Sequence, residues 1–206
     1  IYMYRIVHGF RITKKNKHKK IFGLFLLLFL AIIATIIYLS GDSGILLLSS
    51  LSLSLFRLII AYLISLIIAI VIAVSVSNTK IGDYMIPVFD LLQNLPSFAL
   101  IPLFIFWFGY TNTMTIIFAA TSILWPILFY ILHALKTASV DQENAAKIFG
   151  ATGIKKTLFF SLPIAFPSII TGSIVGFSIG WEAIIGVEII GLSNGIGSFI
   201  NNSSHN

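Results

Sequence analysis

The chain has 206 residues and a formal net charge of +6; 58% of its side chains are hydrophobic and only 10% are charged. A soluble domain carries about 25% charged residues. An ordinary soluble protein is therefore excluded, because 13 basic and 7 acidic side chains cannot cover a domain of this size in water.

The excess positive charge does not indicate nucleic-acid binding. Seven of the 13 basic residues lie between Arg5 and Lys20, directly before the apolar stretch 21–39. A basic flank beside a membrane segment is explained by topology and by anionic lipid, so we expect membrane lipid and no nucleic acid as a partner.

The apolar stretch 21–39 is longer than the apolar region of a signal peptide, which has ~7–15 residues. No Ala-x-Ala cleavage site follows it. We therefore expect a basic cytoplasmic segment, 1–20, followed by one transmembrane domain, 21–206. A cleaved signal peptide is the alternative.

Five stretches are apolar and long enough to cross a bilayer, whose ~30 Å core takes about 20 helical residues. They are residues 21–39, 58–76, 85–108, 114–132 and 158–181. Turn-forming residues fill the breaks, and short breaks such as 78–83 and 109–113 predict antiparallel neighbours. The predicted fold class is an all-α integral membrane protein with five transmembrane helices.

The distribution of charge predicts the orientation of these helices. With the amino terminus inside, Lys80 and the loop 134–157 are inside too, which places 12 of the 13 basic residues in the cytoplasm. We therefore expect a multi-pass protein of a prokaryotic cytoplasmic (inner) membrane. Arg57 is the exception, and we expect its guanidinium to reach the outer headgroups; a bond to a neighbouring helix end is the alternative.

Stretch 85–108 carries polar residues and prolines that are unusual in a membrane helix, namely Gln93, Asn94, Pro96 and Pro102. A proline inside a helix removes a backbone donor and frees carbonyl groups, which must then meet protein or water. Two interpretations stay open: a kinked helix that packs against others, or a broken helix that lines a translocation pathway.

Stretch 158–181 carries Gly172, Gly176 and Gly180 at a spacing of four, which predicts a stripe of close helix packing and, more specifically, a homodimer contact. Glu182 and Glu188 follow this stretch. A continuous helix would point them about 120° apart, so we do not expect a paired acid site. Each is either structural or part of the pathway.

The polar loop 134–157 is predicted to form a helix, a sharp turn and a second helix. Ser139 and Gln142 have the spacing of a capping box, Gly150 suits a left-handed helix end, and Thr152 is placed to cap the next helix. A plain connection between membrane helices needs ~2–8 residues. The longer, ordered corner therefore indicates a partner.

Here the sequence resembles a known family. Asn144-Ala145-Ala146, then Gly150-Ala151, then Leu162-Pro163 and Pro167 are similar to the EAA loop of ATP-binding cassette (ABC) importer permeases. The further similarities, to the nitrate/sulfonate/bicarbonate branch of these permeases, are Arg57, Leu95 to Leu103, Trp107-Phe108-Gly109, Trp181 and Glu188.

The resemblance implies the type I ABC importer permease fold, a permease homodimer, two cytoplasmic ABC ATPases and an extracytoplasmic solute-binding protein. The residues it implies for ATPase coupling are Glu143, Asn144, Ala145, Ala146, Gly150, Ala151, Leu162 and Pro163. The residues predicted for the translocation pathway are Gln93, Asn94, Pro96, Pro102, Glu182 and Glu188, with Glu188 as a gate or packing residue.

Neither an enzyme nor a metal site is expected. No Gly-x-x-x-x-Gly-Lys-Ser/Thr motif occurs, so ATP would be bound by the partner subunit, and no other cofactor is expected. Cysteine is absent. The four histidines, His8, His18, His133 and His205, have no second ligand at helical spacing.

The sequence departs from the family at two places. The family's loop glutamate corresponds to Asn144, and Glu143 stands one position earlier, which is a helix rotation of about 100°. The family also usually continues into a sixth membrane helix, and we expect that helix to be missing after Asn206.

Two other functions fit the sequence less well. An ion-coupled carrier or channel subunit would need ionisable residues within the middle stretches, and no acidic or basic side chain lies between Leu91 and Leu132. A passive membrane scaffold would give no reason for the prolines or the ordered loop.

Overall fold

Helices dominate the part of the chain that the structure describes, and no strand occurs there. The computed structural model describes residues 35, 42–77, 79–139, 142, 144, 146, 148, 150, 151 and 153–204. The chain divides into two units, Ile1–Ser49 and Ser50–Asn206. The predicted stretch 21–39 lies outside the described residues except for Thr35, and the account below concerns the second unit.

The described helices follow one another with short connections. They are α2 (Asp42–Ser77), α3 (Ile81–Gln93), the 3-10 turn η1 (Ser97–Leu100), α4 (Ile101–Phe108), α5 (Asn112–Lys136), α7 (Gly153–Lys156), the π turn η2 (Thr157–Ser161), α8 (Leu162–Ile190) and α9 (Ile196–Ser204).

Three of the described helices are long and apolar enough to cross a membrane, namely Gly44–Ser77, Asn112–Lys136 and Thr157–Ile190. They contain the predicted stretches 58–76, 114–132 and 158–181. The all-helical fold class is confirmed. The apolar stretch was predicted to end at Trp181, but α8 continues past the acidic residue Glu182 to Ile190.

The predicted stretch 85–108 is not one straight span. It consists of Ile81–Gln93 and Ser97–Phe108, which are bent by 87° relative to each other. The residue before a proline avoids the helical region, so α3 ends before Leu95-Pro96, and Pro96 is extended at φ −63° and ψ 109°. Pro102 falls in the first turn of α4, where the missing N–H has no helical partner to lose.

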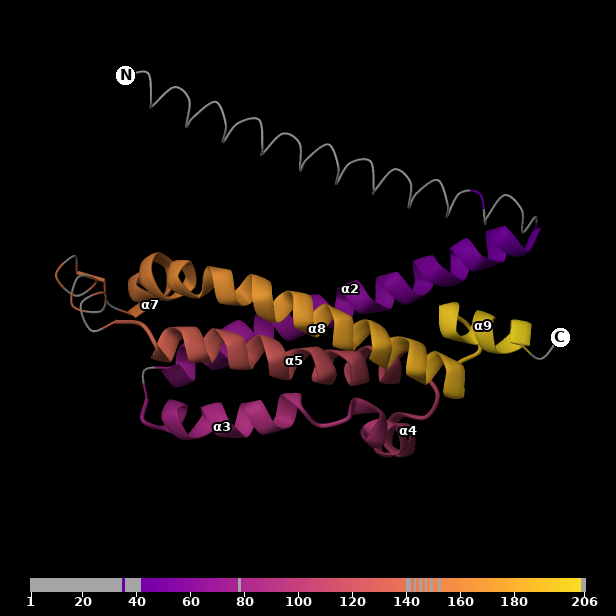
Figure 1. The fold of residues 1–206 in the computed structure, drawn as a ribbon, viewed down its shortest axis with the longest axis horizontal. Coiled ribbons are helices and arrows are strands. Elements are labelled where there is room, and N and C mark those ends of the chain that lie inside the picture. Colours follow the sequence, from indigo (N-terminus) through magenta and orange to yellow (C-terminus); the bar gives the residue numbers. More distant parts are fainter. Residues whose placement is uncertain are drawn as a thin grey trace, which may run out of the picture. The chain divides into compact units, whose positions relative to one another are not determined.

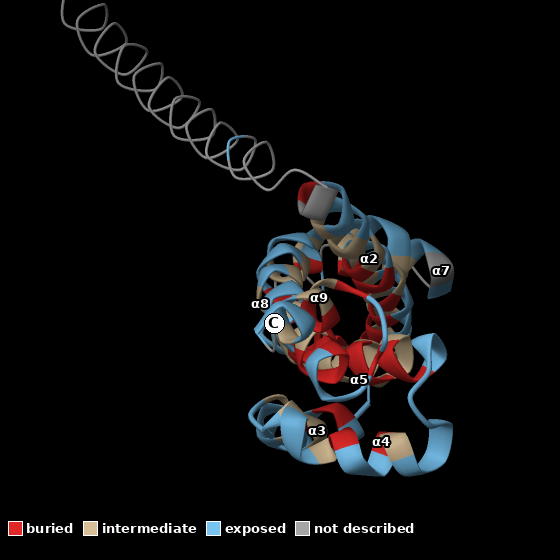
Figure 2. Cartoon of the chain, turned by 90° about the vertical axis from the view of Figure 1, so that its right-hand side faces the viewer, coloured by how far each residue is buried: buried red, intermediate tan, exposed pale blue. Residues whose placement is uncertain are grey.

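The core lies among α2, α5 and α8, whose buried faces turn toward one another in Figure 2. Leu58, Phe118 and Ile127 are fully or almost fully buried there. Helices α3 and α4 pack on α5 and remain largely exposed on their outer sides (Figure 2).

The glycine stripe of α8 is buried, as predicted, but its partner is α5 of the same chain. A Cβ atom on Gly176 would lie 3.1 Å from Cγ2 of Ile123, and one on Gly172 would lie 3.0 Å from Cα of Ile127. The specific expectation of a homodimer contact at this stripe is therefore wrong, because α5 already occupies the surface that the small residues create.

Candidate functional site

The connection between α2 and α3 and the end of α5 lie at one end of the second unit. The Lys136 ammonium lies 3.0 Å from Oδ1 of Asp83 and donates to the carbonyl of Thr79 at 2.7 Å. The lysine stem passes over Gly82, where a Cβ would lie 2.5 Å from Cε of Lys136. Lys80 and the start of the predicted coupling loop therefore share one end (Figure 1).

The loop begins as predicted. The backbone N–H of Ser139 donates to Oε1 of Gln142 at 3.0 Å, and the N–H of Gln142 donates to Oγ of Ser139 at 3.2 Å. This reciprocal pair is a capping box and satisfies two donors at the helix start. Beyond it Asn144, Ala146 and Ile148 are helical. Asn144 and Ile148 are exposed, whereas Ala146 is buried.

The loop helix ends at a glycine in the left-handed region. Gly150 has φ +70°, and the N–H of Ala151 donates to the carbonyl of Ala146 at 2.9 Å. That bond is the 6→1 hydrogen bond of a Schellman motif, so the predicted left-handed end of the helix is confirmed. Glu143, Ala145 and Thr152 lie outside the described residues.

A groove of about 680 Å³ separates this turn from the start of the last long helix. It is lined by Gln142, Ala146, Gly150, Ala151, Lys155, Phe159, Phe160, Pro163 and Ile164. Pro163 has no N–H to donate to the carbonyl of Phe159. The helix widens into the π turn Thr157–Ser161 just before this proline. Leu162 and Pro163 thus begin α8 beside the loop, as part of one corner.

The opposite end of the unit holds a buried ion pair. Arg57 in α2 and Glu188 in α8 are each 1% exposed, and Nη1 of Arg57 lies 2.5 Å from Oε1 of Glu188. Nη2 of Arg57 donates to Oδ1 of Asn112 at 2.5 Å, at the start of α5. It also donates to Oδ1 of Asn194, and Nη1 donates to the carbonyl of Asn194 at 3.2 Å.

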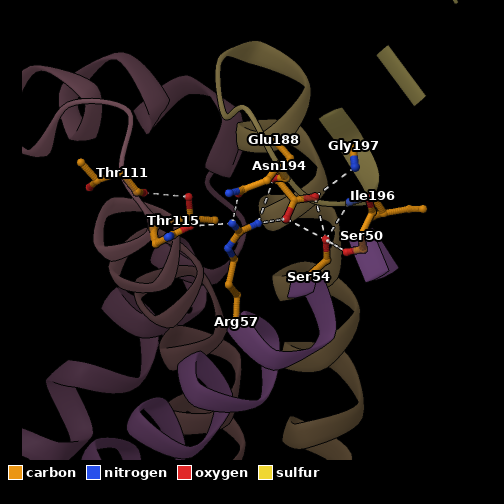
Figure 3. Close-up of polar contacts among 10 residues, drawn as sticks. Ser50, Ser54, Arg57, Thr111, Thr115, Glu188, Asn194, Ile196 and Gly197 are labelled. Carbon is orange, nitrogen blue, oxygen red and sulfur yellow. Dashed lines mark hydrogen bonds and ion pairs between the residues drawn. The ribbon is translucent and has the colours of Figure 1, made fainter. Parts of the chain in front are cut away.

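The expectation that Arg57 reaches the headgroups is therefore wrong, and the alternative, a bond to a neighbouring helix end, is confirmed. The guanidinium already donates hydrogen bonds to a carboxylate and to two amide oxygens, so it would gain no stronger partner by extending to the surface. Figure 3 shows Arg57 pointing into the space between Glu188 and Asn194.

The turn between α8 and α9 closes over this pair. Both carboxylate oxygens of Glu188 accept from Oγ of Ser54 at 2.8 Å, and Oε2 accepts from the N–H of Gly197 at 3.0 Å. Gly195 has φ +113°, and a Cβ there would lie 2.3 Å from the carboxylate carbon of Glu188. Glycine is required at this position both for its backbone angle and for space.

Glu182 takes no part in the buried cluster. It is exposed, whereas Glu188, six residues later, is buried. The prediction that the two glutamates do not form a paired acid site is confirmed, because they lie on different sides of α8. The cluster instead joins α2, α5, α8 and the α8–α9 turn.

The remaining predicted residues lie around the break between α3 and α4. Gln93 is half-buried and lines a pocket of about 260 Å³, whereas Asn94, Pro96 and Pro102 are exposed. Gln93 Nε2 donates to Oδ1 of Asp90 at 2.8 Å, and Asn94 Nδ2 donates to the Asp90 carbonyl at 2.6 Å. Both amides therefore converge on a residue that the sequence analysis did not select.

Sequence reasoning missed Asp90 because the uncharged run of this region begins one residue later, at Leu91. A carboxyl three residues before an amide on a predicted membrane helix was the available signal.

Comparison with known proteins places the chain among transport permeases. Residues 63–206 match the family described as binding-protein-dependent transport system inner membrane component. The chain is 26% identical over 148 residues to the taurine transport system permease protein TauC of Escherichia coli (strain K12). The aligned region covers 71% of this chain and 54% of that protein.

Two other relatives are similar. The putative aliphatic sulfonates transport permease protein SsuC of Escherichia coli (strain K12) is 33% identical over 108 residues, 52% of this chain and 41% of that protein. The nitrate import permease protein NrtB of Synechococcus elongatus is 26% identical over 148 residues, 71% of this chain and 53% of that protein. The chain spans about half the length of these relatives.

Because the family match covers well over half of the chain, this protein belongs, as its resemblance predicted, to the binding-protein-dependent transport system inner membrane components, the permeases of ABC importers.

Proposed function

We propose that this chain is the permease subunit of an ABC importer, that it forms the solute pathway together with a second permease, and that the loop 134–157 couples it to a cytoplasmic ATPase. Family membership supports the permease role. The observation that carries the coupling role is the ordered corner at the lysine-bearing end, with its capping box, its left-handed Gly150 and the adjoining groove.

The corner has the properties that a docking element needs. Two hydrogen-bonded ends hold the loop helix in one shape, so little conformational entropy is lost when a partner binds. Asn144 and Ile148 present exposed side chains, while Ala146 faces the groove. Closure of two ATPases on nucleotide would then move α5 and α8 as rigid bodies and alternate the access of the pathway.

The remaining partners follow from the same proposal. ATP is bound by the ATPase and not by this chain, and a solute-binding protein delivers the solute at the end that carries Glu188. The amino terminus and the loop lie in the cytoplasm because that arrangement places the lysines inside. Taurine, aliphatic sulfonates and nitrate are named for the relatives, and they define the range of small solutes from which a transport screen should start.

Cross-linking tests the docking role. Because the sequence has no cysteine, single cysteines at Asn144 or Ile148 should cross-link to the ATPase through a short thiol-to-amine reagent. The matched control is Ala146→Cys, whose side chain is buried against the groove, and we expect at least about fivefold less product there, because a buried thiol reacts slowly. Equal, background-level product at all three positions in membranes that contain the ATPase would rule out docking through this helix.

A further inference from the structure

The groove between the loop turn and the start of α8 crosses the boundary of the membrane. The span Thr157–Ile190 is long and apolar enough to cross a bilayer, and Lys155 and Lys156 stand directly before it. Pro163 and Ile164, which line the groove, follow Lys155 in the sequence by a little over two helical turns, about 12–14 Å along a helix axis. The groove therefore extends from the level of the lipid headgroups to that of the acyl chains.

The two ends of the groove differ in polarity. Among the described residues that line it, the charged side chain is Lys155, the other polar side chain is Gln142, and no carboxylate is present. Oε1 of Gln142 accepts from the N–H of Ser139, so the amide has its Nε2 hydrogens to offer to an anion. Both polar residues precede the membrane span. The deeper part of the groove is lined by Phe159, Phe160, Pro163 and Ile164.

The aromatic wall lacks a cover from this chain. Phe159 is 77% exposed although it lies within the membrane span, so an apolar neighbour from outside the chain must meet it. Beside it, the Lys156 ammonium lies 6.0 Å from the ring centroid of Phe160. A second positive charge is therefore held next to the groove wall, at the level where the span begins.

An acidic lipid fits this surface better than a protein does. A soluble ATPase does not reach apolar walls at bilayer depth, and Asn144 and Ile148, the exposed positions through which docking is proposed, do not line the groove. A helix of a second permease would cover Phe159 but would gain nothing from Lys155. A phospholipid with a negative headgroup matches both ends, because its phosphate and its acyl chains lie in the same order along the groove.

From these observations we infer that the groove binds an acidic phospholipid from the leaflet on the side of the loop, with its headgroup phosphate at Lys155 and Gln142 and an acyl chain along Phe159. Hydrogen bonds from an ammonium to phosphate oxygens are charge-assisted, and basic pockets at the cytoplasmic ends of membrane helices bind acidic headgroups. The lipid fills the space between Ala146 and α8 and so supports the loop from the membrane side. This inference goes beyond the proposed function, because lipid binding requires neither an ATPase nor a solute.

Photo-labelling tests the site. The full chain is reconstituted into phosphatidylcholine vesicles that contain a small fraction of phosphatidylglycerol with a diazirine in its acyl chain, and the adducts are mapped by mass spectrometry after irradiation. A phosphatidylcholine probe with the same acyl chain is used in parallel. We expect segment 157–164 to carry several times more adducts from the phosphatidylglycerol probe than from the phosphatidylcholine probe.

Variants of the lysine assign the preference to the groove. Lys155→Gln should reduce the ratio of the two kinds of adduct about fivefold, which corresponds to the ~1 kcal/mol that one cation contributes near a membrane surface. Lys155→Arg keeps the charge and should keep the ratio. The matched control is Lys80→Gln, which removes an exposed lysine that does not line the groove and should leave the ratio unchanged.

The other occupants give different results. Equal labelling of segment 157–164 by the two probes, or a ratio that Lys155→Gln leaves unchanged, would overturn the inference. A segment that neither probe labels would mean that protein covers the groove, and loss of the adducts when purified ATPase is added would assign the groove to the ATPase. Because the experiment gives its result without the ATPase, a failure of Ile148→Cys to cross-link would count against the proposed docking and not against the lipid site.

Discussion

Replacing Gly150 with valine should abolish recovery of the ATPase with this chain while leaving its membrane insertion intact. Gly150 has φ +70°, and among the described residues other than its chain neighbours no atom lies within 4 Å of a Cβ placed there. The expected effect is therefore one of backbone conformation and not of space. A β-branched residue resists positive φ at a cost of about 1–3 kcal/mol, so the turn would open and the loop helix would lose its orientation.

The matched control is Gly150→Asn, because asparagine adopts the left-handed region more readily than other side chains do. The measurement is the amount of ATPase recovered per permease after mild detergent extraction. We expect less than about a tenth of the wild-type amount for valine, which corresponds to ~1.4 kcal/mol or more, and most of it for asparagine. Recovery of the ATPase with Gly150→Val at the wild-type level would contradict the role of this turn.

Glu188→Ala should be strongly destabilising. The substitution leaves the Arg57 guanidinium, 1% exposed, without its counter-charge, and breaking a buried ion pair from one side costs about 3–5 kcal/mol. The N–H of Gly197 loses its acceptor as well, and the hydroxyl of Ser54 keeps only the carbonyl of Ser50. A large fall in the temperature at which the detergent-solubilised chain aggregates, followed by size-exclusion chromatography, is the expected result.

Two further variants separate pairing from burial. Glu182→Ala removes an exposed carboxylate from the same helix and should change the aggregation temperature little. Arg57→Met combined with Glu188→Leu replaces the pair by apolar side chains of similar size and should recover much of the loss, as buried pairs in other proteins do. If Glu188→Ala aggregates at the same temperature as Glu182→Ala, the buried cluster does not stabilise the fold.

The features that sequence predicted well are those set by neighbouring residues. The apolar stretches 58–76, 114–132 and 158–181 appear as helices because length and hydropathy suffice to identify them. The capping box of Ser139 and Gln142 and the left-handed Gly150 were predicted for the same reason, since each depends on a few adjacent residues.

The features that sequence missed depend on distant partners. Arg57 and Glu188 are 131 positions apart, and nothing near either residue indicates the other. The glycine stripe revealed close packing but not its partner, because Gly176 would fit a second copy of α8 as well as it fits α5. Likewise, Pro96 marks where a helix ends but not the 87° bend that follows.

The side of the membrane on which the loop lies decides the central claim. Ile148 lies in the loop that follows α5, and Thr113 lies in the first turn of α5; both are exposed. Single cysteines at these two positions should be treated with a membrane-impermeant maleimide in intact cells. The proposed orientation predicts that Thr113→Cys is labelled at once and that Ile148→Cys is labelled only after the membrane is opened. Labelling of Ile148→Cys in intact cells would place the loop outside, where no ATPase can reach it, and would contradict the coupling role.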